Sequence, residues 1–117
     1  MKAPLKTAGT LGTILALLLV NPAAYAQCDS RSCTGLLKRL YMSDSRLLIG
    51  IDGDLKRLSC NAVSDVYIEA PLSHPAFDSW HSMLLGAMLS KRPVSIRIRK
   101  GERQGECLVG YIVLDRL

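Results

Sequence analysis

Residues 80–99 read WHSMLLGAMLSKRPVSIRIR, an apolar run that reaches a basic pair and then alternates apolar with polar residues. Between Phe77 and Met88 the apolar residues recur at steps of three and four, which is the spacing of one helix face. After Pro93 the period becomes two, because Val94, Ile96 and Ile98 alternate with polar residues. The stretch therefore divides at Pro93 into a helix and a strand.

The helix is expected to begin near Pro75, a residue that suits a first helical turn, with Ser73 or His74 as its N-cap. It ends at the segment Lys91-Arg92-Pro93, since proline cannot continue a helix. Further apolar residues widen the apolar stripe and predict burial on more than one side: Met83, Leu85 and Leu89. The apolar run is too short to cross a membrane, which takes about 20 residues.

The flanking segments predict strands. Asp52-Gly53 lies between two apolar runs and indicates a hairpin, because glycine accepts a positive φ. The final stretch, ECLVGYIVLDRL, is apolar on both faces and is typical of a central strand, with Cys107, Val109, Tyr111 and Val113 sharing one side. The other expected extended segments are residues 36–42, 46–52, 55–61 and a short piece at 65–70.

This order of elements favours a mainly β fold with one helix. Three strands, a helix and two further strands form the order of a small five-stranded OB-like barrel, in which the helix plugs the barrel between the third and fourth strands. A generic α+β sandwich is the alternative.

The N-terminus has the three parts of a secretory signal peptide over residues 1–26. Lys2 and Lys6 precede a short apolar segment over 11–20, and Ala24-Tyr25-Ala26 matches the small-x-small cleavage pattern. We therefore expect a periplasmic or secreted protein. Residues 27–117 have room for a single small domain with one core, and no membrane span remains after removal of the signal.

The charge of the chain does not indicate a nucleic-acid protein. The formal net charge is +5, and loss of Lys2 and Lys6 leaves about +3, spread as separate basic pairs. Arg97 and Arg99 could contact phosphates, with Tyr41, Tyr67 or Tyr111 as stacking groups. Export and the modest charge argue against this, and a solvated strand face explains the two arginines equally well.

All four cysteines lie in the part that remains after cleavage, and an oxidising compartment favours their pairing. Three connectivities are open for four cysteines. We expect a local bond between Cys28 and Cys33 and a long one between Cys60 and Cys107. No cysteine pair has the two-residue spacing of a zinc knuckle.

The residues that most resemble a catalytic or metal-binding cluster are His74, Asp78 and His81, whose spacing places them within a narrow arc of a helix. An exposed polar edge opposite the apolar stripe has the same pattern, so we expect no metal, no cofactor and no enzyme. Asp52 and Asp54 lack the further oxygen ligands of a calcium loop.

The signal peptide, the disulfide-bonded small barrel and the run from Leu84 through Lys91-Arg92-Pro93 into VSIRIR resemble the B subunits of pentameric bacterial exotoxins of the subtilase-cytotoxin type. The likeness covers about residues 75–115. It implies an OB fold whose helices line the centre of a ring and whose outer faces bind host glycans. No sugar-binding position is carried over, because the first half of the chain shows no residue-by-residue match.

Two functions follow from these observations as hypotheses. The first is an exported binding module that recognises a glycan or a protein, with a toxin-B-like homo-oligomer as one form. The second is a solitary periplasmic structural or inhibitor protein without glycan binding. The sequence does not identify the ligand-binding residues of either.

Overall fold

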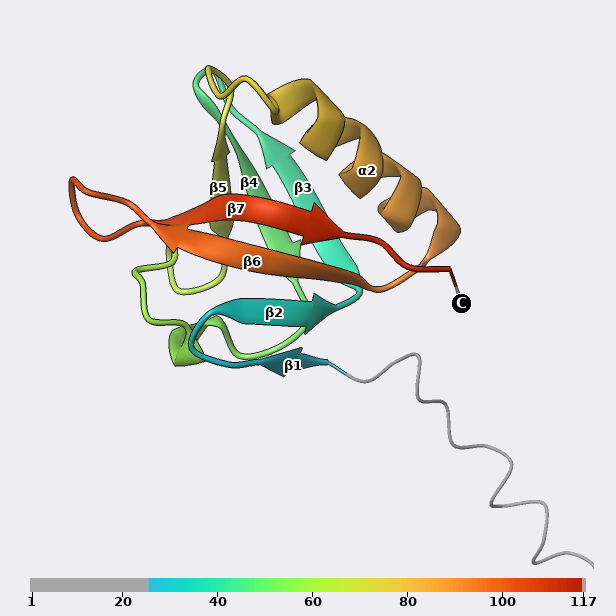
Figure 1. Cartoon of the computed structure of the whole chain (residues 1–117), viewed down its shortest axis with the longest axis horizontal. Coiled ribbons are helices and arrows are strands. Elements are labelled where there is room, and N and C mark those ends of the chain that lie inside the picture. Colours follow the sequence, from blue (N-terminus) through green and yellow to red (C-terminus); the bar gives the residue numbers. More distant parts are fainter. Residues whose placement is uncertain (1–25, 117) are drawn as a thin grey trace, which may run out of the picture.

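The computed structural model describes residues 26–116 (Figure 1). The predicted signal peptide therefore lies outside the described residues except for Ala26. The described chain forms, in order, β1 (Gln27–Cys28), β2 (Ser32–Gly35), β3 (Leu37–Met42), β4 (Arg46–Ile51), the 3₁₀ helix η3 (Leu55–Arg57), β5 (Ile68–Pro71), α2 (Phe77–Ser90), β6 (Val94–Lys100) and β7 (Cys107–Val113). The prediction of a mainly β fold with one helix is confirmed for this part of the chain.

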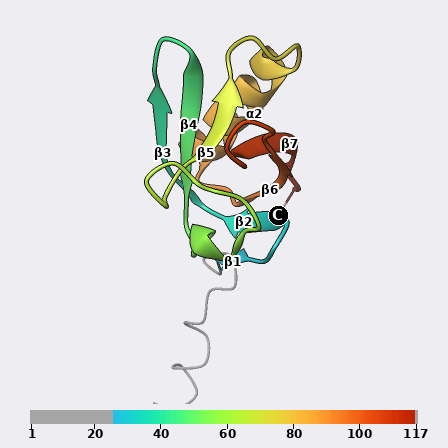
Figure 2. The same cartoon turned by 90° about the vertical axis from the view of Figure 1, so that its left-hand side faces the viewer.

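The strands form one curled, mixed sheet in the order β1-β2-β6-β7-β5-β4-β3. Neighbouring strands are antiparallel except β5 and β7, which are parallel. The sheet bends into a half-barrel, with β6 and β7 crossing in front of β3, β4 and β5 (Figures 1 and 2). The predicted five-stranded OB-like barrel is therefore wrong in strand number, and the seven strands form a half-barrel rather than a closed barrel.

The extra strands have a local origin. Only Leu36 separates β2 from β3, yet β2 pairs with β6 and β3 pairs with β4. One continuous stretch is thus bent at Leu36 and contributes to two distant parts of the sheet. A short β1, absent from the sequence prediction, pairs with β2 at its other side.

The predicted hairpin around Asp52-Gly53 is wrong. β4 lies where a strand was expected, but residues 55–57 form η3, and the antiparallel partners of β4 are β3 and β5. The Asp54 side chain caps η3 by accepting a bond from the Lys56 N–H at 3.1 Å. Leu55 and Leu58 are both buried, and their three-residue spacing suits a helical turn rather than a strand.

Helix α2 packs through the face that the sequence predicted. Phe77, Trp80, Leu84 and Ala87 are buried in the core. Neither predicted N-cap is right: the N-cap is Ala76, which makes no side-chain cap bond, and the His74 Nδ1 accepts a bond from the Ala76 N–H at 3.0 Å. In the described part of the chain, no helix combines the length and apolar character needed to cross a membrane.

The opposite face of α2 is exposed, so the prediction of burial on more than one side is wrong. Leu85 is 42% exposed and Leu89 is 82% exposed. The helix lies along the side of the curled sheet and is covered from one direction only (Figure 1). Two large apolar side chains therefore face away from the core of this chain.

Strand β7 is central, as predicted, but its two faces are not those of a regular strand. The β6–β7 register pairs Arg97 with Tyr111 and Ile98 with Val109, which leaves Gly110 as an extra residue. This bulge shifts the alternation by one residue. Val109 consequently faces the core, whereas Tyr111 and Val113, expected on the same side as Val109, are exposed.

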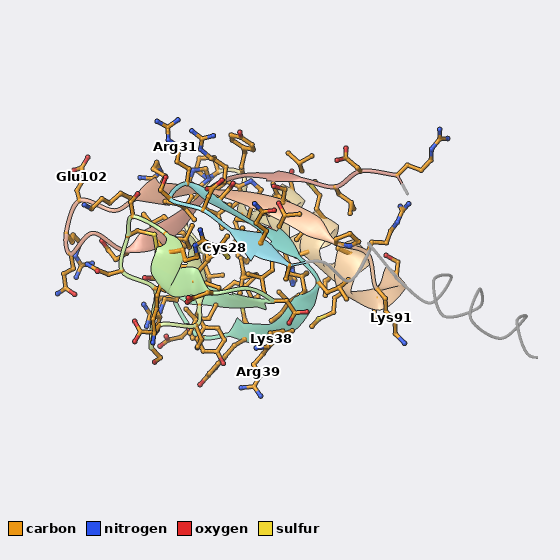
Figure 3. The ribbon with its side chains drawn as sticks, turned by 90° about the horizontal axis from the view of Figure 1, so that it is seen from below. Cys28, Arg31, Lys38, Arg39, Lys91 and Glu102 are labelled. Carbon is orange, nitrogen blue, oxygen red and sulfur yellow. A yellow bond between two sulfur atoms is a disulfide. The ribbon has the colours of Figure 1, made fainter. Side chains whose placement is uncertain are left out.

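Both expected disulfides are present. Cys28–Cys33 joins β1 to β2, and Cys60–Cys107 ties the segment before β5 to the start of β7. Cys28 lies inside the molecule, while Arg31, Lys38, Arg39 and Lys91 point outward in different directions (Figure 3). These basic side chains do not form one shared surface.

Candidate functional site

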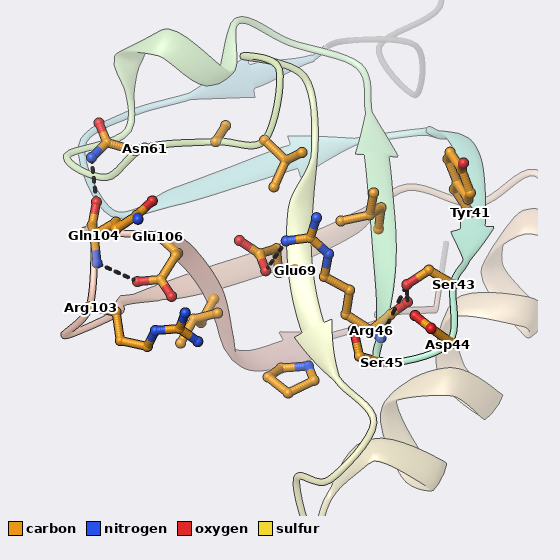
Figure 4. A pocket seen from close by; sticks show the side chains of 15 residues that line it. Tyr41, Ser43, Asp44, Ser45, Arg46, Asn61, Glu69, Arg103, Gln104 and Glu106 are labelled. Atoms are coloured by element: carbon orange, nitrogen blue, oxygen red, sulfur yellow. Dashed lines mark hydrogen bonds and ion pairs between the residues drawn. The ribbon is translucent and has the colours of Figure 1, made fainter.

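A hollow of about 850 Å³ lies on the outer face of the sheet, away from α2. Leu48 of β4, Glu69 of β5 and Leu108 of β7 line its floor, and they are neighbours in the strand register. The segment at 61–63 and the β6–β7 loop form one rim, and the β3–β4 turn forms the other (Figure 4). The curl of the sheet thus brings four separate segments around one surface.

Glu69 is the buried charged residue of the described chain, with 7% of its surface exposed. Its neighbours Ile68 and Ala70 are fully buried in the core, so the alternation of β5 directs the Glu69 side chain to the outer face. Its carboxylate forms an ion pair with Arg46, with 2.8 Å between Nη1 and Oε1. Within residues 26–116 the protein hydrogen bond to this carboxylate is made to Oε1, and no protein group donates to the second oxygen, Oε2.

Arg46 is held by the tight turn that precedes β4. The Ser43 hydroxyl donates to the Arg46 carbonyl oxygen at 2.9 Å and accepts from the Arg46 N–H at 3.3 Å. Because the backbone at Arg46 is fixed twice, its side chain extends along β4 toward Glu69 (Figure 4). The Arg46 side chain remains 41% exposed, so its other N–H groups are accessible to a ligand.

The opposite rim is also fixed by hydrogen bonds. Asn61 donates from Nδ2 to the Gln104 carbonyl oxygen at 2.7 Å, and the Gln104 N–H donates to Glu106 Oε1 at 3.1 Å. Backbone N–H groups of Glu106 itself and of Gln104, followed by the charge of Arg103, lower the pKa of the Glu106 carboxyl group. The adjacent Cys60–Cys107 bond anchors this rim to β7.

Tyr41 stands at the rim that the β3–β4 turn forms, with 51% of its surface exposed. Its ring meets the ring of Tyr67 edge to face, with 6.2 Å between centroids. Arg39 donates to the Tyr67 hydroxyl at 3.1 Å. Gly50 lies beneath Tyr67, where a Cβ would approach the ring to 3.4 Å, so the glycine gives the tyrosine room to cross β4. The aromatic pair is therefore held in place beside the hollow.

The histidine cluster considered from the sequence does not assemble. The His74 ring stacks on Trp80 with 4.4 Å between centroids, and the His81 ring stacks on Phe77 at 5.6 Å. No group of three His, Cys, Asp or Glu side chains with metal-binding geometry occurs in the described chain. His74 and His81 thus serve as packing partners of the helix aromatics.

The residues considered for nucleic-acid binding are also separated. Arg97 lies opposite Tyr111 across the β6–β7 ladder. Tyr41 and Tyr67 lie together at the other end of the sheet, with β5 and β4 between β7 and β3. The arginines and the paired tyrosines therefore do not form a continuous groove.

Sequence reasoning missed Glu69 and Arg46. A usable signal was present for Glu69, because it is a single charged residue within the short apolar segment YIEA. No comparable signal marks Arg46, because its importance depends on its contact with Glu69 on the neighbouring strand.

Comparison of the chain with protein-family models, with curated proteins and with solved structures gave no match.

Proposed function

We propose that this chain is an exported module that binds a glycan or a protein through the outer-face hollow. The observation that carries the proposal is the ion pair between buried Glu69 and partly exposed Arg46 in this hollow. Charged groups are rarely buried unless they are paired, and binding sites are concave surfaces with a few well-placed polar groups. Two disulfides are consistent with an oxidising location outside the cytoplasm.

The strand order supports the resemblance to toxin B subunits. If β2 and β3 are counted as one bent strand, the order β3-β4-β5-β7-β6-β2 returns to that strand, and α2 lies between β5 and β6. This order is consistent with an OB barrel, which is a five-stranded and partly open barrel. The finer OB assignment is part of the proposal.

The same resemblance implies a ring in which helices face the centre. The exposed side of α2 supports such an assembly, because Leu85 and Leu89 project from it beside Gly86, around which there is open space. We propose that a second copy of this chain covers that face. Exposed apolar side chains that gather on one face are typical of contacts between proteins.

A glycan array with the purified protein tests the binding proposal. Arg46→Ala should abolish binding to any glycan that the wild type retains, while Arg99→Ala, an exposed arginine outside the hollow, should leave binding intact. Equal binding by both variants would show that the hollow is not the site.

Light scattering after gel filtration tests the assembly. The wild type should elute as a homo-oligomer, and Leu89→Glu should elute as a folded monomer because Leu89 contributes little to the core of its own chain. A monomeric wild type without any glycan ligand would favour a solitary periplasmic structural or inhibitor protein.

A further inference from the structure

The unpaired Oε2 of Glu69 indicates what the ligand must supply. Because no protein group donates to Oε2, a ligand in the hollow can donate a hydrogen bond to it without displacing a protein contact. Oε1 accepts from Arg46 at 2.8 Å, so Oε2 lies next to an arginine whose remaining N–H groups are donors. The floor of the hollow thus presents an acceptor and a donor side by side.

From this pairing we infer that the hollow binds an uncharged sugar through two adjacent ring hydroxyl groups. A hydroxyl group both donates and accepts, so one hydroxyl can donate to Glu69 while its neighbour accepts from Arg46. The inference rests on the proposed binding function and adds the class of ligand. The five lining residues that would contact the sugar are Glu69, Arg46, Tyr41, Leu48 and Leu108.

The charges around the hollow favour a neutral ligand. The lining contains two arginines, Arg46 and Arg103, and three carboxylates, Asp44, Glu69 and Glu106. Arg46 is already paired with Glu69, so an acidic sugar that approaches Arg46 brings its carboxylate next to Glu69 and is repelled. A cationic ligand gains little there for the same reason, because the ion pair as a unit carries no net charge.

The apolar parts of the hollow suit the C–H faces of a sugar ring. Leu48 and Leu108 flank Glu69 in the register, and the exposed ring of Tyr41 stands at the rim, fixed by its contact with Tyr67. An aromatic ring offers apolar surface with little loss of conformational freedom. A hydroxyl-rich molecule with apolar ring faces therefore matches both the floor and the rim.

Titration calorimetry with matched pairs of small sugars tests the inference. The probes are the methyl glycosides of glucose, galactose and mannose, each compared with the uronic acid in which the primary alcohol is a carboxylate. We expect at least one neutral glycoside to bind about tenfold more tightly than its acidic counterpart, because the carboxylate of the uronic acid is repelled by Glu69. Tighter binding of the uronic acids would overturn the inference while leaving the proposed binding function intact.

Single-deoxy analogues of the glycoside that binds then show which two sugar hydroxyls are recognised. This measurement uses the wild-type protein, so it does not depend on whether a variant folds. Removal of either of two adjacent hydroxyls should weaken binding, and equal binding by all analogues would contradict recognition of a diol.

Glu69→Gln should weaken binding about tenfold, and Glu102→Gln, in the same chain but outside the hollow, should not. Circular dichroism confirms that both variants are folded. Failure of every neutral and acidic sugar, on the array and in calorimetry, would remove the glycan proposal itself.

Discussion

Removal of the Cys60–Cys107 bond should destabilise the domain far more than removal of the Cys28–Cys33 bond. The first bond joins residues 47 positions apart and the second joins residues 5 positions apart. A bond that closes a longer loop removes more conformational freedom from the unfolded chain. The two bonds are otherwise comparable, because Cys28, Cys33 and Cys107 are all buried.

The loop-closure relation gives the magnitudes. The long bond is worth about 4 kcal/mol and the short bond about 2 kcal/mol. The free energy of unfolding should therefore differ by about 2 kcal/mol between the two double-alanine variants. For a domain of this size that is a large share of a total stability of about 5–15 kcal/mol.

Urea unfolding followed by far-UV circular dichroism measures this difference, with the free energy of each variant extrapolated to water. The variants are Cys60→Ala with Cys107→Ala, and Cys28→Ala with Cys33→Ala. The reasoning would be refuted if the variant without the local bond were equally or more destabilised. That result would mean that the contacts of the sulfur atoms, rather than loop length, decide the contribution of each bond.

Four further predictions each concern a single position. Leu84→Ala should lower the free energy of unfolding by about 2–5 kcal/mol, because the side chain is fully buried, and Arg97→Ala should change it by less than about 0.5 kcal/mol in the same denaturation assay. Gly53→Ala should cost about 1–3 kcal/mol, since Gly53 has a φ of 120° and a Cβ there would lie 2.9 Å from Cys28 Sγ; unchanged stability would contradict the strain. The pKa of Glu106 is lower in the folded state than in the unfolded chain. Its ionised form therefore stabilises the β6–β7 loop at pH values above the ordinary glutamate pKa. This contribution is lost as the pH falls through the lowered pKa. Carbon-detected NMR titration of the Glu106 carboxyl group should show the low value, and a value at or above the ordinary range would disprove the backbone contacts.

Local sequence patterns correctly predicted the elements in which apolar residues recur with a regular helical or strand period. Helix α2 and strand β6 meet at Pro93 as expected, because proline ends the first period before the second begins. The disulfide pairing was also predicted, since a local bond and a long bond suit an exported domain. The helix and the strand depend on residues close together in the chain, and the disulfides depend on the oxidation of cysteines in an oxidising compartment.

The failures arise where tertiary contacts decide. Leu55 and Leu58 follow a strand-like run but are buried through a helical turn, and the bulge at Gly110 reverses the faces of the last strand. The candidate site was missed altogether, because Glu69 and Arg46 are separated by 23 residues and meet only when β4 and β5 pair. A charged residue within an apolar strand can indicate such a site from the sequence. Its partner is identified only from the tertiary structure.

The bend at Leu36 has a consequence for the order in which the domain is made. A ribosome releases the N-terminal end of a chain first, so β3 and its partner β4 become available early, whereas β2 must wait for β6, some 60 residues later. Half of one continuous stretch can therefore pair at once while the other half stays open. The Cys28–Cys33 bond can close during this interval, but Cys60 needs Cys107 from the last strand. Cys60 and the β6-facing edge of β2 therefore have no partner until the C-terminal strands are made.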